Sequence, residues 1–332
     1  GEEVILDGSR TISPTAFSLV TDPAALARMH TSASNNVYAA VITDATLISL
    51  LEDPSRQLSV DNRMLQIARY PTFGLGYLDH GDILADDTGS ANEMGTPSNP
   101  VGATVDLDWG QDSAKWSAEL TRIKKARMIG YVSADWQKAT LRLHSMDGAG
   151  VLRIMDATSY GFGNANVVRP YIDHLLCELD EPGEWYFDDI DNTLYLWPPS
   201  FLASTTAIGV WAGPEVFNID GADHVHIERL TMQNLTGVSN GDGAVDIRSG
   251  SNNRVAGCTF RNITSHILAF NVWGGTNNGA LSCNFIDVNN TSRLYGGSAT
   301  ESAIVPGSNY LENCHFTQVY SKSFYGKVTA LG

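Results

Sequence analysis

Four short segments in the last third of the chain share one alternation of apolar and polar positions. One column of their alignment contains Leu230, Cys258, Cys283 and Cys314, and a second column, two residues on, contains Met232, Phe260, Phe285 and Phe316. The columns recur at steps of 28, 25 and 31 residues. Such a period is typical of solenoids, in which each repeat buries its apolar face against the next. Because residues i and i+2 point to the same side of a strand, the runs predict strands with both columns in one core.

Each repeat is therefore expected to form one turn of a parallel β-helix, with stacked cysteines and stacked aromatic rings inside it. Asn253, Asn278 and Asn309 form a third column just before the strands. Asparagine side chains there can bond to one another and to the backbone of a bend. The cysteines are expected to be free, buried thiols, and no Cys/His spacing suggests a zinc site.

The first two thirds of the chain mix helical and strand-like patterns. Helices are expected over residues 22–30, 43–52 and 113–125, the first with Asp22 as N-cap and Pro23 at its first position. Residues 72–112 are rich in Gly, Asp, Asn and Pro, and they predict a long loop.

The alternation of large apolar residues predicts a hairpin over residues 184–196, and residues 207–211 are expected to start the coil. The predicted organisation has three parts. Residues 1–54 form an N-terminal strand and helices that lead into the coil, residues 55–200 an inserted β-rich domain, and residues 201–332 the parallel β-helix.

The net charge of the chain limits the kinds of molecule that it is expected to bind. The 332-residue chain has a net charge of −16, which argues against nucleic acid or an anionic membrane as a partner. No apolar run reaches the length of a transmembrane helix, and no basic segment followed by an apolar one opens the chain. Any signal peptide is expected to have been removed already, and the expected location is secreted or periplasmic.

Several stretches carry a likeness to known proteins. Residues 179–188, followed by 194–199, resemble a segment common in bacterial right-handed parallel β-helix carbohydrate-active enzymes of the glycoside hydrolase and polysaccharide lyase types. Residues 67–71 and 130–136 resemble landmarks of a β-sandwich-like domain inserted near the start of the coil in those proteins, and residues 241–247 resemble their early turns.

The resemblance covers most of the chain from about residue 58 onward. It implies a mostly β fold, a right-handed parallel β-helix with an inserted β-rich domain in the N-terminal half. It also implies a secreted enzyme that cleaves glycosidic bonds of a polysaccharide or oligosaccharide. The shared landmarks are turns, a hairpin and core aromatic residues, so they indicate architecture more directly than reaction.

The last residues depart from this pattern. The coil stops in mid-turn at residues 329–332 without a polar capping element, whereas the relatives run on for further turns. An open solenoid end exposes apolar surface and a strand edge. A second chain or a C-terminal fragment is therefore expected to complete the coil, and some of the chemistry can lie beyond Gly332.

Glycosidic bonds are hydrolysed by two carboxyl groups that flank the bond. Histidine can assist proton transfer near neutral pH. The candidate catalytic residues are Asp242, Asp246, His266, Asp287, Glu301 and His315. Each has a plainer alternative, because a carboxylate can cap a turn or lie on a solvated acidic face, and a histidine can simply be exposed.

Exposed aromatic side chains in the coil could stack on sugar rings. The candidate substrate-binding residues are Trp273, Asn271, Tyr295 and Tyr325. A lyase would need a base and a cation or basic groove that neutralises a uronate. No such groove emerges, and no acidic loop has calcium spacing, so no cofactor or metal is expected and no motif supports Ca²⁺. Hydrolysis is favoured, with β-elimination and non-catalytic carbohydrate binding as the alternatives.

Overall fold

The computed structural model describes residues 2–72, 82–123, 125–134, 137–162, 170–213, 215–237, 243–300 and 303–317. The fold is mostly β, with 46% strand and 12% helix. The contacts divide the chain into two compact units. Unit 1 consists of Gly1–Ile12, Ser49–Met64 and Ala207–Gly332, and unit 2 of Ser13–Ile48 and Leu65–Thr206.

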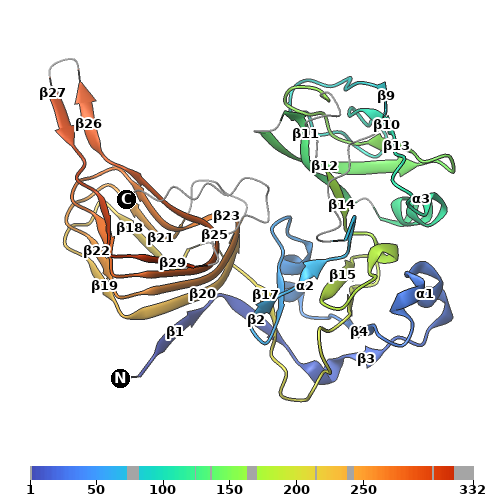
Figure 1. Cartoon of the computed structure of the whole chain (residues 1–332), viewed down its shortest axis with the longest axis horizontal. Helices are drawn as coiled ribbons and strands as arrows, with labels where there is room; N and C mark the ends of the chain where they lie inside the picture. Colours follow the sequence, from blue (N-terminus) through green and yellow to red (C-terminus); the bar gives the residue numbers. More distant parts are fainter. Residues whose placement is uncertain are drawn as a thin grey trace. The chain divides into compact units, whose positions relative to one another are not determined.

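Unit 1 contains a β-solenoid of about three turns, which confirms the predicted fold class (Figure 1). Its largest sheet stacks parallel strands from successive turns: β1 (Val4–Asp7), β20 (Leu230–Gly237), β23 (Thr259–Trp273), β25 (Asn284–Tyr295), β29 (His315–Thr317), β18 (Phe217–Asp220) and β21 (Gly243–Arg248). A second parallel sheet contains β19 (His226–Glu228), β22 (Arg254–Ala256), β24 (Gly279–Leu281) and β28 (Tyr310–Glu312). The hairpin of β26 (Gly297–Thr300) and β27 (Ala303–Pro306) projects from the coil (Figure 1).

Both predicted columns face the interior of the coil, and Phe316, in the last described turn, is 37% exposed. The register pairs Met232 with Phe260, Phe260 with Phe285, and Phe285 with Phe316. The three phenylalanine rings stack nearly parallel, with centroids 4.9 and 4.8 Å apart. The cysteines beside them are free; Cys258 and Cys283 are buried, and Cys314 is partly exposed.

The predicted asparagine column is also confirmed. The Oδ1 atom of Asn278 accepts hydrogen bonds from the backbone N–H and from Nδ2 of Asn253, both at 3.0 Å. The backbone N–H of Asn278 donates to Oδ1 of Asn309 at 2.8 Å. Each amide thus satisfies polar backbone groups at a corner where no strand pairing is available.

A second polar column, which the sequence did not predict, lies at another bend. Asn234 and Asn262 have positive φ angles of 59° and 54°, and Asp287 continues their column with a φ of 52°. Nδ2 of Asn262 donates to Oδ1 of Asn234 at 2.9 Å. Asn and Asp tolerate the left-handed region better than other residues with a Cβ, which explains their repetition at this bend.

The region where the coil was expected to start pairs differently. Strand β17 (Ile208–Trp211) is antiparallel to β2 (Ser9–Ile12) and β5 (Leu58–Val60), and β6 (Arg63–Met64) completes this four-stranded sheet. Apart from β1, which pairs in parallel with β20, the parallel strands of the coil follow β17 and start with β18 and β19. An apolar alternation alone does not distinguish parallel from antiparallel pairing.

Unit 2 contains two sheets and short helices. One sheet contains β3 (Ser18–Leu19), β4 (Tyr38–Val41), β16 (Thr193–Leu196), β15 (Glu184–Asp188) and β7 (Gln66–Ile67). The other contains β8 (Arg69–Tyr70), β14 (Tyr171–Asp173), β11 (Arg127–Ala134), β12 (Gln137–Met146), β13 (Val151–Ile154), β10 (Thr104–Asp106) and β9 (Asp82–Ala85). The predicted hairpin over 184–196 is confirmed as the antiparallel pair β15–β16.

The three predicted helices are confirmed as α1 (Pro23–Arg28), α2 (Ala45–Glu52) and α3 (Ser113–Arg122). Asp22 caps α1 by accepting a hydrogen bond from the backbone N–H of Ala25 at 2.9 Å. The long loop predicted over 72–112 is wrong in part, because β9 and β10 lie within it and pair with each other. Strands of three or four residues are too short to show a clear period in a Gly- and Pro-rich stretch.

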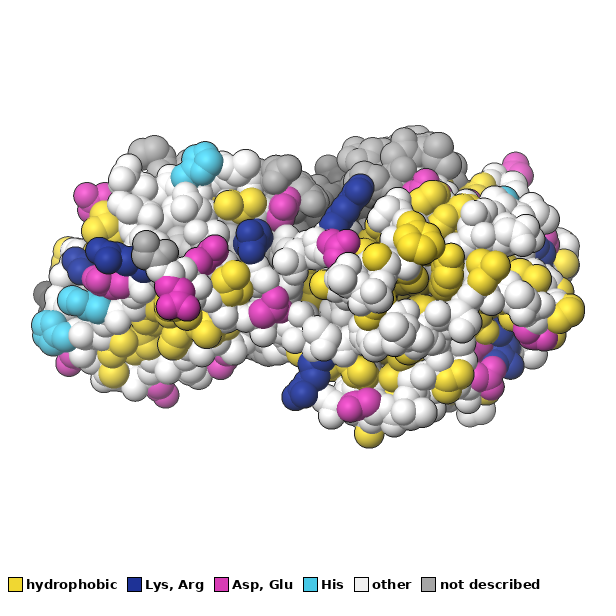
Figure 2. Space-filling model, turned by 90° about the horizontal axis from the view of Figure 1, so that it is seen from below, with side chains coloured by type: hydrophobic (Ala, Val, Ile, Leu, Met, Phe, Trp, Pro, Cys, Tyr) yellow, Lys and Arg dark blue, Asp and Glu magenta, His cyan; other side chains and the backbone are white. Residues whose placement is uncertain are grey.

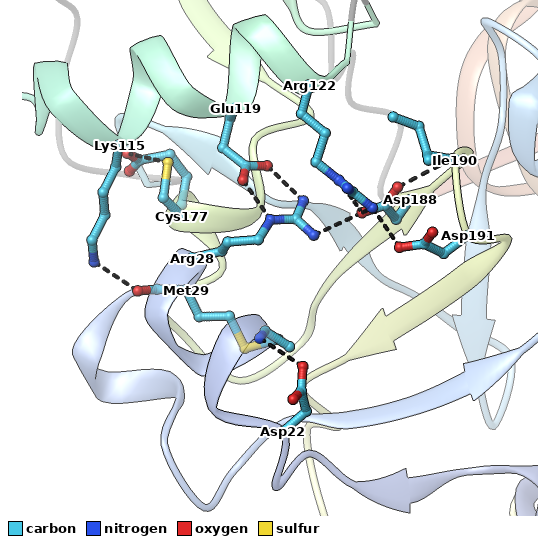
Figure 3. A network of polar contacts seen from close by, with 12 residues as sticks. Asp22, Arg28, Met29, Lys115, Glu119, Arg122, Cys177, Asp188, Ile190 and Asp191 are labelled. Carbon is cyan, nitrogen blue, oxygen red and sulfur yellow. Dashed lines mark hydrogen bonds and ion pairs between the residues drawn. The ribbon is translucent and has the colours of Figure 1, made fainter.

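A network of charged side chains joins α1, α3 and the turn after β15 in unit 2 (Figure 3). Arg28 donates to Glu119 at 2.7 and 3.0 Å and to Asp188 at 2.8 Å. Arg122 donates to Asp188 at 3.1 Å and also to Asp191. Although burial opposes ionisation of Asp188, the hydrogen bonds from both arginines outweigh it and lower the pKa of that carboxyl. All these groups bind one another, so the network is structural.

Candidate functional site

Outward-pointing residues of four adjacent strands form one surface on the coil. The register aligns Phe217, Val245 and Phe270 in the core, so the intervening residues point outward. The outward residues are Asn218 and Asp220 on β18, Asp246 and Arg248 on β21, Asn271 and Trp273 on β23, and Arg293 and Tyr295 on β25. These eight residues are called the candidate face.

A chain of polar contacts crosses the candidate face from turn to turn. Oδ2 of Asp246 accepts hydrogen bonds from Nη2 and Nε of Arg248 at 2.8 and 3.0 Å. Oδ1 of Asp246 accepts from Nδ2 of Asn271 at 2.7 Å, and Oδ1 of Asn271 accepts from Nε of Arg293 at 3.1 Å. Asp246 and Asn271 are fully buried. The ion pair is therefore held in a fixed geometry by neighbours on both sides.

Two aromatic rings lie at the exposed part of this face. Trp273 is 53% exposed and Tyr295 is 56% exposed, and their rings meet edge to face with centroids 5.2 Å apart. The guanidinium of Arg293 lies 4.5 Å from the ring centroid of Trp273 and 5.7 Å from that of Tyr295. This cation–π contact orients the rings without burying them. Such exposed rings can pack against the C–H face of a sugar.

A second carboxylate lies beside the face. Oε2 of Glu215 accepts a hydrogen bond from Nδ2 of Asn218 at 3.3 Å, and its Oε1 lies 3.7 Å from Nη2 of Arg248. The side chain of Glu215 is 29% exposed, whereas that of Asp246 is 0% exposed. Arg248 thus contacts one buried and one accessible carboxylate. In the view of Figure 2, basic and acidic side chains are interspersed over the coil.

Four of the predicted site residues meet on the candidate face: Asp246, Asn271, Trp273 and Tyr295. The amide of Asn271, expected to contact substrate, is instead engaged by Asp246 and Arg293 inside the surface.

The other described candidates lie elsewhere on the coil. Asp287 belongs to the bend column of Asn234 and Asn262, as the turn alternative had anticipated. His315 is exposed on β29, where its ring nitrogens lie 3.2 and 3.3 Å from the hydroxyl of Thr317.

Three predicted residues, Asp242, Glu301 and Tyr325, lie outside the described residues, as does the side chain of His266.

Glu215, Arg248 and Arg293 were not among the predicted site residues. A signal for Arg293 existed, because Asp246, Asn271 and Arg293 recur at steps of 25 and 22 residues, close to the period of the core columns. Outward positions vary in residue type, so this polar column is harder to recognise than a column of cysteines. Loops of unequal length also shift its register relative to the core columns.

Cys177 and Cys283 are not placed for nucleophilic chemistry, whereas hydrogen bonding with Cys283 lowers the pKa of Cys258 and of Cys314. Hydrogen bonding with the neighbouring thiols, together with burial, raises the pKa of Cys283, and burial raises the pKa of Cys177. Among the described residues, no group of three or more His, Cys, Asp or Glu side chains could hold a metal ion. The described part of the chain also contains no helix long and apolar enough to span a membrane.

Comparison with known proteins gives one structural likeness. No family model matches the chain, and no curated protein matches it. A solved structure described as a glycoside hydrolase is similar to it with a TM-score of 0.57 and 15% sequence identity. The match covers 96% of this chain and 60% of that protein, so the chain spans about 60% of the length of its structural neighbour. At this identity the likeness shows a shared fold.

Proposed function

We propose that this protein is a secreted or periplasmic carbohydrate-active enzyme that cleaves glycosidic bonds of a polysaccharide or oligosaccharide. The observation that carries the proposal is the exposed pair Trp273 and Tyr295, held by Arg293 next to a chain of carboxylate and amide groups. The fold shared with a glycoside hydrolase supports it. The proposed substrate stacks one sugar ring on the exposed face of one of these two aromatic residues and extends across the candidate face.

The proposed reaction is hydrolysis by paired carboxyl groups. Such a pair divides the roles of acid and of base or nucleophile. Glu215 is the accessible carboxylate beside the candidate face, and Asp246 holds Arg248 in contact with it. The second carboxyl group of the pair is proposed to be Asp242 or Glu301, which are candidates from the sequence alone. Arg248 would help keep a carboxylate ionised and would bind the oxygen atoms of a sugar.

Product analysis tests the reaction. The protein is incubated with a panel of neutral and uronate-containing polysaccharides, and reducing ends and unsaturated uronates are measured together. Hydrolysis predicts new reducing ends without the ultraviolet absorbance of an unsaturated uronate. The appearance of that absorbance would select β-elimination instead.

Two substitutions of exposed aromatic residues test whether the candidate face is needed for activity. Trp273→Ala is expected to lower kcat/KM by about tenfold or more, which corresponds to about 1.4 kcal/mol of lost binding. Phe201→Ala is the control, because Phe201 is 82% exposed but belongs to unit 2. Equal activity of both variants and the parent protein would refute the role of the candidate face.

One observation favours a second function, carbohydrate binding without turnover. Asp246 is the carboxylate nearest the centre of the candidate face, yet it is fully buried and both of its oxygens accept hydrogen bonds. Isothermal titration with the same saccharides distinguishes the two functions. Binding that depends on Trp273, with no product formed by the full-length protein, would select the binding function.

A further inference from the structure

A cavity of about 210 Å³ opens on the surface of unit 2, apart from the residues of the candidate face. Its lining comes from three segments: Asn92 and Met94; Ala139, Thr140 and Leu141 of β12; and Asp156, Ala157, Thr158 and Ser159. Leu141, Asp156, Ala157 and Thr158 are almost fully buried and form its floor. Asn92, Met94 and Thr140 are exposed and form its rim.

Backbone contacts fix the walls of this cavity. The backbone N–H of Asn92 donates to the carbonyl of Thr158 at 3.1 Å, and the N–H of Ala157 donates to the carbonyl of Glu93 at 2.9 Å. At Gly95 the chain passes so close to Met155 that a Cβ would lie 2.0 Å from its carbonyl oxygen. The loop is thus held against the floor, as a preformed binding site requires.

The negative charge of Asp156 inside the cavity is neutralised by Arg142. Asp156 is the one ionisable residue among the described residues of the lining, and it is 7% exposed. Its carboxylate accepts hydrogen bonds from Nε and Nη2 of Arg142 at 2.9 and 2.6 Å and from the backbone N–H of Gly95 at 3.1 Å. A charged ligand would therefore lose its hydration without gaining an opposite charge, so the cavity favours a neutral one.

The remaining groups suit a ring that carries several hydroxyls. The Ser159 hydroxyl donates to Oδ1 of Asn92, and the Thr158 hydroxyl donates to Asp87 at 2.6 Å, so both hydroxyl oxygens retain acceptor capacity. Thr140 and Nδ2 of Asn92 add donors at the rim. Met94, which is 69% exposed, provides an apolar contact. The volume is below that of pockets for drug-sized ligands and fits a single ring.

From these features we propose that the cavity binds one uncharged sugar residue, with Met94 against its C–H face and the hydroxyl-bearing side chains around its edge. This is a second saccharide site, carried by unit 2, and it does not depend on the candidate face being catalytic.

Methionine methyl NMR on the full chain tests this site directly. The protein is labelled with ε-¹³C-methionine, and the Met94 signal is assigned with Met94→Leu. Glucose, galactose, mannose and xylose, and their β-linked disaccharides, are then titrated in. The expected result is a saturable shift of the Met94 signal with at least one of these sugars, while the signal of Met232, buried in the coil, stays unchanged.

Two variants make the outcome decisive. Thr140→Arg places a large side chain on the exposed rim and is expected to weaken binding by about tenfold or more, whereas Trp273→Ala is expected to leave the Met94 response intact. No saturable shift with any of the neutral sugars, equal affinity in Thr140→Arg, or tighter binding of glucuronate than of glucose would overturn the proposal. Loss of activity in Trp273→Ala with an intact Met94 response would separate this site from the candidate face.

Discussion

Replacement of one buried acid should make the stability of unit 2 less dependent on pH. Glu184 on β15 is fully buried. Its Oε2 atom accepts hydrogen bonds from the backbone N–H groups of Asp180 and Glu181 at 2.9 and 3.3 Å. Its Oε1 atom is buried and has no hydrogen-bond partner within the described part of the chain. Burial, together with the nearby charge of Asp180, raises the pKa of Glu184 from 4.5 to about 9.

The direction in which pH changes the free energy of unfolding depends on whether the folded or the unfolded chain keeps the proton of Glu184. Between pH 4.5 and about 9 the folded chain holds a proton on Glu184 that the unfolded chain has released. The free energy of unfolding therefore falls as the pH rises, by up to about 1.4 kcal/mol per pH unit from this residue. At about pH 7 the loss relative to the fully protonated state is about 3 kcal/mol.

Glu184→Gln removes the titration and preserves the shape. The amide oxygen can replace Oε2 as acceptor for the two backbone N–H groups, and the NH₂ group occupies the place of the protonated Oε1. We expect the variant to be more stable than the parent by less than about 1 kcal/mol at about pH 5 and by about 3 kcal/mol at about pH 7.

Urea unfolding followed by tryptophan fluorescence measures the difference, because Trp109, Trp116, Trp185 and Trp197 all lie in unit 2. Glu312→Gln, at an exposed position of unit 1, is the matched control and should show no difference at either pH. A change in stability by the same amount at both pH values would show that Glu184 does not keep a proton in the folded chain that the unfolded chain releases.

Three further substitutions test the packing and the polar networks. Phe285→Ala is expected to destabilise the coil by about 3–5 kcal/mol in chemical denaturation, and Phe316→Ala by clearly less, because Phe285 is 0% and Phe316 is 37% exposed. Asn278→Ala leaves buried backbone groups of the corner without partners and should lower stability by about 1–3 kcal/mol; an unchanged thermal midpoint would contradict this. Asp188→Asn removes the charge shared by two arginines and should destabilise unit 2 by about 3–5 kcal/mol near neutral pH, with a smaller difference once acid protonates the parent carboxyl.

The core of the coil could be predicted from sequence because its constraints repeat. Phe260 and Phe285 occupy the same environment in successive turns, so the same residue type recurs at the repeat distance. The corner amides Asn253 and Asn278 recur for the same reason, since each satisfies the backbone of its neighbour. These positions determined the expected fold class, which the structure confirms.

The candidate face could be predicted only in part. Asp246 was predicted as a candidate carboxylate and Trp273 as an exposed aromatic residue. Their proximity depends on the register between β21 and the C-terminal half of β23, which the core columns do not determine. Glu215 lies before β18, outside any repeat pattern, and its position next to Arg248 is visible only in three dimensions. The cavity of unit 2 is formed by three segments distant in sequence, so no local pattern indicates it.

The stacked cysteines make the stability of individual turns measurable by chemistry. Cys258, Cys283 and Cys314 are free and lie on successive turns, and their exposure increases from the first two to the last. In a solenoid each turn contacts only its neighbours, so opening can proceed turn by turn. Thiol-labelling rates at the three positions, separated by mass spectrometry of proteolytic fragments, would report how far fraying penetrates the coil under native conditions. The sequence thus already contains one thiol probe in each of three successive turns, without any engineered label.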